Sequence, residues 1–123
     1  MASFPVVVHH HTGCGTSRKV IAAIRDAGLE PQIVEYLKTG WTRGQLQALF
    51  AVAGHNARAF LREKEALVDE LGLREPADDA AEDEARLLDA MVAHPILVNR
   101  PIVASPSGVA LCRPAERVQD LLP

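Results

Sequence analysis

The chain has 123 residues, of which 48% are hydrophobic and 24% are charged, and its formal net charge is −3. This length suits one compact domain, predicted over residues 1–123, with a monomer as the default state. The negative charge disfavours nucleic acid as a partner, and the apolar runs are too short to cross a membrane. The chain shows no secretory signal and has too few cysteines for a disulfide framework, so we expect a cytoplasmic location.

The first third of the chain predicts a strand–helix–strand unit. A β-branched run over residues 4–8 predicts a strand buried on both faces, followed by a loop. Apolar residues at helical spacing predict a helix over residues 16–27, ended by Gly28. Residues 32–36 predict a second strand, and the unit therefore predicts a parallel strand pair.

The middle of the chain predicts a group of helices, covering residues 42–54, 56–62, 65–71 and 85–93. Thr42 and Gln45 have the spacing of a capping box, and Asn56 is expected to cap the second of these helices. Residues 74–83 are acidic and contain a proline, so they predict a solvated surface loop whose charges serve solubility.

The last third predicts extended segments over residues 96–99 and 102–104, separated by Arg100 and Pro101. Turn residues then predict a hairpin whose second strand covers residues 109–112, and Pro114 predicts the start of a last helix. The order of elements favours an α/β, thioredoxin-like fold: a four-stranded mixed sheet with flanking helices and a helical insertion.

Cys14 lies between two glycines where the first strand gives way to a helix. The positive end of the helix dipole favours the thiolate, and we expect Arg18 and His10 to strengthen the effect. The glycines would let an anion approach the backbone amides. These features favour a nucleophilic cysteine over the alternative of a buried, inert thiol.

The residue three positions after Cys14 is Ser17, so the chain lacks a Cys-x-x-Cys pair. An oxidised or substituted Cys14 must be cleared by Cys112 or by an external thiol. Three consecutive histidines cannot all face one ion, so no metal site is expected. His10 is expected to be a polar neighbour of the thiol, and His9 and His11 to be surface or capping residues.

Residues 14–18, Cys-Gly-Thr-Ser-Arg, resemble the active-site loop of the glutaredoxin-coupled arsenate reductases, the ArsC-like family. Residues 60–62, 94–103 and 111–114 match three further blocks of that family in order and at compatible spacing. The resemblance covers essentially the whole chain and implies a thioredoxin-like fold. It also implies roles for single residues: Cys14 as nucleophile, Arg62, Arg100 and Arg113 as oxyanion ligands, His10 assisting the thiolate, Ser17 bonding near the thiol, and Pro101 after a cis peptide bond.

The activity implied by the resemblance is reduction of arsenate to arsenite through a covalent adduct on Cys14. Glutathione, as co-substrate, and glutaredoxin, as partner, would resolve the adduct, and no bound cofactor is needed. Guanidinium groups suit this substrate on physical grounds, because they stay charged and offer forked donors to a tetrahedral oxyanion. For four other arginines we expect surface ion pairs instead: Arg43, Arg58, Arg74 and Arg86.

The sequence departs from the family pattern just before the nucleophile. The family's His-Asn-Pro-Xaa is replaced by residues 10–13, His-His-Thr-Gly, and loss of the proline predicts a more flexible loop. Glu63 follows Arg62 and could partly offset the positive pocket. Cys112 is expected to be structural, with a disulfide to Cys14 as the alternative.

Two other functions fit parts of the pattern. One is a glutathione-dependent thiol–disulfide oxidoreductase with arsenate incidental, in which Cys14 would be needed but the three arginines would not. The other is a regulator of the Spx type, which shares the fold and binds RNA polymerase. Ser17 in place of a second cysteine and the Leu-Cys-Arg-Pro block at residues 111–114 both argue against the regulator.

Overall fold

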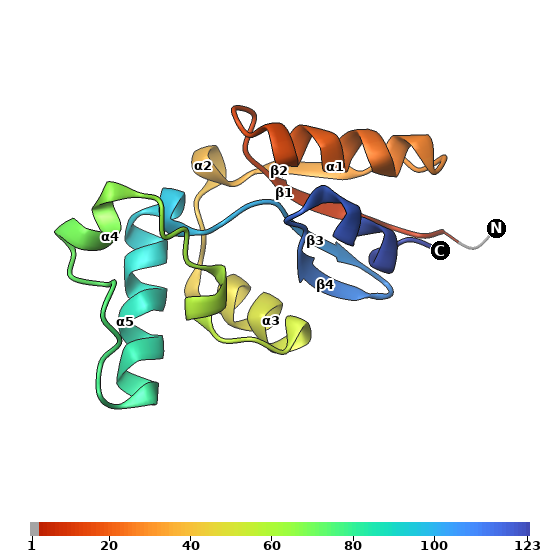
Figure 1. The fold of residues 1–123 in the computed structure, drawn as a ribbon. Coiled ribbons are helices and arrows are strands. Elements are labelled where there is room, and N and C mark those ends of the chain that lie inside the picture. Colours follow the sequence, from red (N-terminus) through yellow and green to blue (C-terminus); the bar gives the residue numbers. More distant parts are fainter. Residues whose placement is uncertain (1–2) are drawn as a thin grey trace. The chain divides into compact units, whose positions relative to one another are not determined.

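The computed structural model describes residues 3–123, and the chain divides into two compact units (Figure 1). The first unit combines the N-terminal part of the chain, up to Thr39, with Arg100–Pro123. The second unit is Gly40–Asn99. The expectation of a single domain over residues 1–123 stays a prediction.

The first unit is built on a four-stranded sheet in the order β2-β1-β3-β4. β1 (Val7–His10) pairs in parallel with β2 (Gln32–Glu35) and antiparallel with β3 (Ile102–Ser105). β3 pairs antiparallel with β4 (Gly108–Leu111). The helix α1 (Gly15–Asp26) connects the two parallel strands, so the predicted βαβ unit, hairpin and mixed sheet are confirmed.

The core of the first unit lies where α1 and the final 3₁₀ helix η3 (Ala115–Leu121) meet the sheet (Figure 1). Val8 of β1, Ile24 of α1, Val103 of β3 and Val118 of η3 are all fully buried in one cluster. Burying an aliphatic side chain of this size stabilises a fold by about 1.5–3 kcal/mol. This cluster therefore fixes α1, and with it the start of the helix, against the sheet.

The ends of several elements differ from the prediction. β1 includes His9 and His10, which pair with β2, so the strand begins later and ends later than residues 4–8. Burial alternates along β1 between buried and half-buried residues, so the expectation of burial on both faces is wrong. Tyr36 belongs to a short helix, α2 (Tyr36–Thr39), rather than to the second strand.

The second unit contains three α-helices and two 3₁₀ helices: α3 (Arg43–Ala53), η1 (Ala57–Phe60), α4 (Ala66–Glu70), α5 (Ala80–Ala93) and η2 (Pro95–Leu97). The predicted capping box is confirmed, because Thr42 and Gln45 each accept the backbone N–H of the other. Asn56 caps η1 as predicted. The segment 96–99, predicted to be extended, instead begins within η2.

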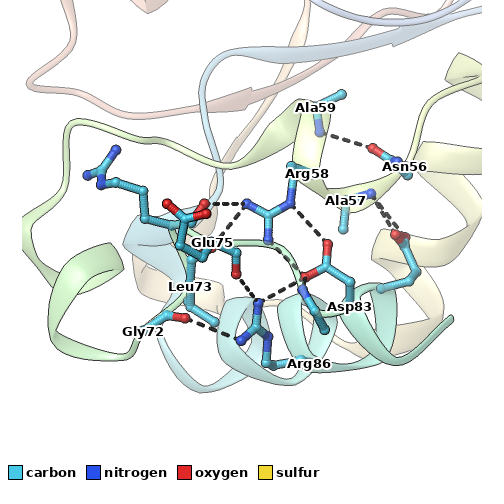
Figure 2. A network of polar contacts seen from close by, with 12 residues as sticks. Asn56, Ala57, Arg58, Ala59, Gly72, Leu73, Glu75, Asp83 and Arg86 are labelled. Carbon is cyan, nitrogen blue, oxygen red and sulfur yellow. Dashed lines mark hydrogen bonds and ion pairs between the residues drawn. The ribbon is translucent and has the colours of Figure 1, made fainter. Parts of the chain in front are cut away.

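The prediction of a solvated loop over residues 74–83 is wrong at its end, because α5 begins at Ala80 and Asp83 is buried. Arg58 donates to both carboxylate oxygens of Asp83, at 3.0 and 2.9 Å, and Arg86 donates to one at 2.9 Å (Figure 2). The Ala77 amide adds a fourth hydrogen bond at 3.0 Å. Acidic composition suggested solvation, but Arg58, 25 residues earlier in the sequence, and Arg86, three residues later, neutralise the buried carboxylate.

The four arginines expected to form surface ion pairs all do form ion pairs, but the carboxylate partners differ in exposure. Arg43 pairs with Asp89 and Arg74 with Asp69 at exposed positions, so two surface ion pairs are confirmed. Arg58 and Arg86 are also ion-paired, but to the buried Asp83, and Arg58 further donates to the Leu73 carbonyl at 3.0 Å. Over residues 3–123, no helix has the length and apolar content needed to cross a membrane.

We predict that Asp83→Asn destabilises the protein by about 3 kcal/mol, the size typical of breaking a buried ion pair. The hydrogen bond from Arg58 holds the pKa of Asp83 well below its usual range. Its stabilisation is therefore present above about pH 4, the pKa of an unfolded aspartate, and is lost as the pH falls toward the folded pKa. Urea denaturation should show a difference between the variant and the wild type that narrows below pH 4.

The matched control is Asp69→Asn, which breaks an exposed ion pair to Arg74. Exposed pairs contribute little, so this variant should unfold at the same urea concentration as the wild type. Equal destabilisation by both substitutions would contradict the importance assigned to Asp83.

Candidate active site

The sheet topology gathers three segments at one edge. β1 and β3 are antiparallel and pair His9 with Ile102, so the loop after β1 lies beside the residues that precede β3. β3 and β4 pair Ile102 with Leu111, which brings the segment after β4 to the same edge. Cys14, Arg100 and Arg113 stand on these three segments.

Cys14 is the N-cap residue of α1 and has an extended backbone conformation. Its sulfur accepts hydrogen bonds from the backbone N–H groups of Ser17 and Thr16 and from the side chains of Arg100 and Arg113. For Arg113 the donor is Nη1, 3.6 Å from Sγ. Burial raises the pKa of the Cys14 thiol, but these four donors outweigh it and lower the pKa from its ordinary value.

The two arginines are also joined to each other. Nη1 of Arg113 donates to the backbone carbonyl of Arg100 at 3.1 Å as well as to the sulfur. Arg100 is itself buried, with 7% of its surface exposed. A buried guanidinium next to a sulfur places a permanent positive charge where a thiolate or a bound oxyanion would need one.

His10 contacts Ser17 at the start of α1. Its Nδ1 lies 2.8 Å from Oγ of Ser17, and the two side chains are buried together. Burial, the largest effect, lowers the pKa of His10 below its ordinary value, with the charges of His11 and Arg18 acting in the same direction and Glu35 opposing them. The lowered pKa favours the neutral ring, and the assistance of His10 to the thiolate stays a prediction.

Ser17 links the histidine to the helix start in two ways. Its hydroxyl contacts His10 and accepts the backbone N–H of His11 at 3.3 Å. Its own backbone N–H is one of the donors to Cys14. The expectation of a hydrogen bond near the thiol agrees with this backbone contact.

Arg18 contacts the loop before the nucleophile. Its Nη1 donates to the carbonyl of Thr12 at 2.7 Å, and its effect on the thiolate stays a prediction. Nδ1 of His11 accepts the N–H of Gly13 at 3.0 Å, and the carbonyl of His11 accepts the N–H of Cys14 at 3.0 Å. These bonds restrain the loop in place of the missing proline.

His9 and His11 have different environments. His11 is a capping residue of the loop, as expected. His9 lies in β1 and is half-buried, and burial lowers the pKa of its ring to about 4. Among residues 3–123, no group of three or more His, Cys, Asp or Glu side chains could hold a metal ion.

Arg62 belongs to the second unit and contacts other residues of that unit. Its Nε donates to Glu65 at 3.2 Å and its Nη1 to Oδ1 of Asn99 at 3.3 Å. Its backbone N–H donates to the Leu97 carbonyl at 2.8 Å, beside a bridge between Leu61 and Val98. Its place beside Cys14 stays a prediction.

The Arg100–Pro101 peptide bond is cis, the geometry that the family resemblance implies, and Arg113–Pro114 is cis as well. Cys112 lies between these segments but is fully buried in the core cluster of the first unit. Burial raises the pKa of its thiol to about 12. Both cysteines are free thiols, and the burial of Cys112 agrees with the structural role expected of it.

Sequence reasoning missed the two backbone N–H groups of Thr16 and Ser17 as individual donors to the sulfur. The available signal was the helix start after Cys14, which predicted a favourable dipole without naming the amides. It also missed the hydrogen bond from Arg18 to the Thr12 carbonyl. The local sequence does not show whether the Arg18 side chain contacts the Cys14 sulfur or a backbone carbonyl of the loop.

We predict that iodoacetamide at pH 7 modifies the native protein once, at Cys14. The lowered pKa of Cys14 gives a reactive thiolate fraction, whereas the Cys112 thiol is buried and remains protonated. Intact-mass measurement should show one adduct in buffer and two after unfolding in urea. Cys14→Ser is the control and should show none in buffer; modification of native Cys112 would contradict the assignment.

Comparisons with known proteins agree on one family. The sequence profile of the ArsC family matches residues 9–121. The chain is 49% identical to an arsenate reductase of Rhizobium meliloti (strain 1021), over 96% of this chain and 81% of the relative, and 47% identical, with the same two coverages, to one of Escherichia coli (strain K12).

A solved structure described as the arsenate reductase from Vibrio cholerae superposes with a TM-score of 0.89 and 34% identity, covering 98% of this chain and 100% of the other. This match confirms the thioredoxin-like architecture that the order of elements predicted. The profile covers most of the chain, and two relatives are nearly half identical to it, so the protein is a member of the ArsC family.

Proposed function

We propose that this protein reduces arsenate to arsenite, with Cys14 as the nucleophile. The observation that carries the proposal is the thiol of Cys14, whose pKa is lowered by two backbone amides and two guanidinium groups against the effect of burial. A thiolate is the nucleophilic form of cysteine, and the same guanidinium groups suit a tetrahedral oxyanion. Relatives named arsenate reductase match this chain over 96% of its length.

The proposed first step is attack of the Cys14 thiolate on the arsenic of bound arsenate. A sulfur–arsenic bond forms, and one arsenate oxygen leaves as water after protonation. Arg100 and Arg113 stabilise the negative charge that develops on the remaining oxygens, and Arg62 is proposed as a third ligand. His10 and Ser17 hold the start of α1 through their mutual contact, which keeps the Ser17 amide directed at the sulfur.

The proposed second step uses glutathione as an external thiol. Its thiolate attacks the Cys14 sulfur, a disulfide bond forms, and the sulfur–arsenic bond breaks with its electron pair remaining on arsenic. Arsenic passes from the pentavalent to the trivalent state while the two sulfurs are oxidised. Glutaredoxin then reduces the mixed disulfide. Cys112 is buried with a raised thiol pKa, which supports an external resolving thiol in a reducing cytoplasm.

The rival thiol–disulfide oxidoreductase would use the same thiolate but needs no oxyanion ligands. Substitution of the arginines separates the two functions, since only arsenate requires a positively charged pocket. The regulator of the Spx type gains no support from the site, because Ser17 contacts His10 and leaves Cys14 without a neighbouring thiol partner in the motif.

We predict that Cys14→Ser abolishes arsenate-dependent NADPH oxidation in an assay with glutathione, glutaredoxin and glutathione reductase, because serine is not ionised at neutral pH. The matched control is Cys112→Ala, which removes the other thiol from the core and should retain activity. Absence of arsenate-dependent oxidation with the wild-type protein would refute arsenate as the substrate.

We predict that Arg113→Ala lowers kcat/KM for arsenate by about 100-fold, the effect typical of losing one donor to a developing oxyanion. Arg113→Lys should recover only part of the loss, since an ammonium lacks the forked donors. Arg43→Ala, which removes an exposed arginine paired with Asp89, is the control and should leave kcat/KM unchanged. Equal activity on arsenate in the Arg113 variant and the control would favour the thiol–disulfide oxidoreductase.

A further inference from the structure

The loop before the nucleophile is organised around His11. The backbone N–H of His11 donates to Oγ of Ser17 at 3.3 Å, and its carbonyl accepts the N–H of Cys14 at 3.0 Å. Its ring nitrogen Nδ1 accepts the N–H of Gly13 at 3.0 Å. His11 thus bonds to the backbone of Gly13 and Cys14 and to the hydroxyl of Ser17, which follows Cys14 in the sequence.

The ring of His11 lies directly on Gly13. A Cβ atom at position 13 would stand 2.8 Å from Cε1 and 3.2 Å from Nδ1 of the ring, closer than side-chain contacts allow. Gly13 does not have a positive φ, so a side chain at this position would displace the His11 ring rather than strain the backbone.

We propose that His11 is a pH-dependent positioning residue for Cys14. Only a ring that is unprotonated at Nδ1 can accept the Gly13 N–H, and this bond holds the loop that sets the sulfur against the amides of Thr16 and Ser17. Protonation turns Nδ1 into a donor, the bond to Gly13 breaks, and the loop loses its restraint. The consequence for turnover rests on the proposed arsenate reduction, but the positioning of the thiol does not.

Charged groups from several elements lie near this loop. Arg18 of α1 donates to the Thr12 carbonyl, and Arg100 and Arg113 donate to the sulfur of Cys14. His10, the residue before His11, pairs in the sheet with Glu35 of β2. Protonation of His11 would add a positive charge among these groups and remove the acceptor of the Gly13 N–H.

The test follows the rate of Cys14 alkylation by iodoacetamide between pH 5 and 8, by intact mass, in three proteins. His11→Asn keeps an acceptor for the Gly13 N–H, because an asparagine oxygen makes the same turn, but cannot titrate. His11→Ala removes the acceptor and should react about fivefold more slowly at every pH, the loss expected for one hydrogen bond. The wild type should match His11→Asn at the alkaline end of this range and approach the rate of His11→Ala at the acidic end.

A second pair of variants tests the contact itself. Gly13→Ala should displace the His11 ring and slow alkylation at pH 7.5 as much as His11→Ala does. In the double variant, the alkylation rate should equal that of His11→Ala alone. Circular dichroism and urea denaturation check that each variant is folded.

The proposal is overturned if the wild type and His11→Ala react alike at all pH values, or if the wild type follows His11→Asn at low pH. It is also overturned if the reductions in alkylation rate caused by Gly13→Ala and His11→Ala add in the double variant. None of these measurements uses arsenate, so failure of the proposed substrate would leave their outcome unchanged.

Discussion

The chemistry of the first unit depends on the ionisation of one sulfur atom. Burial alone would keep the Cys14 thiol protonated, as it does for Cys112 in the same unit. The two cysteines differ in their hydrogen bonds: the Cys14 sulfur accepts from two helix amides and two guanidinium groups, whereas the Cys112 thiol donates to the carbonyl of Ala110. The same residue type is therefore reactive at a helix start and inert in the core.

The sheet makes this arrangement possible because antiparallel pairing fixes which chain segments meet. Arg100 precedes β3 and Arg113 follows β4, and the register that pairs Ile102 with Leu111 holds them together. The N–H of Cys112 donates to the Pro101 carbonyl at 2.9 Å, which continues the ladder beyond the strands. The pairing of β1 with β3 then places the nucleophile loop at the same edge.

In the second unit, charged side chains form a buried hydrogen-bond network around Asp83. Asp83 is surrounded by two arginines and a backbone amide, and it joins α5 to the segments around Arg58 and Ala77 (Figure 2). A buried carboxylate with these partners is costly to disrupt, since removing one charge leaves the others uncompensated. Arg58 stands four residues before Arg62, so the network also anchors the 3₁₀ helix η1 from which Arg62 follows.

The sequence by itself determined the elements whose signals are local. The helix after Cys14, the capping box at Thr42 and the hairpin after Ile102 follow from hydrophobic spacing, side-chain caps and turn residues, all within a few positions of each other. The blocks around Cys14, Arg100 and Arg113 likewise indicated the family and the residues that meet at the sulfur.

Tertiary structure alone decided which of two possible partners each polar group takes. The acidic composition of residues 74–83 predicted a solvated loop that includes Asp83. Closeness to Cys14 in the sequence predicted that Arg18 and His10 favour its thiolate. In the structure Asp83 is neutralised by Arg58, which lies 25 residues earlier, Arg18 bonds to Thr12, and His10 bonds to Ser17. Burial and long-range pairing set the energy of a charged or polar side chain, and neither can be read from its immediate neighbours in the chain.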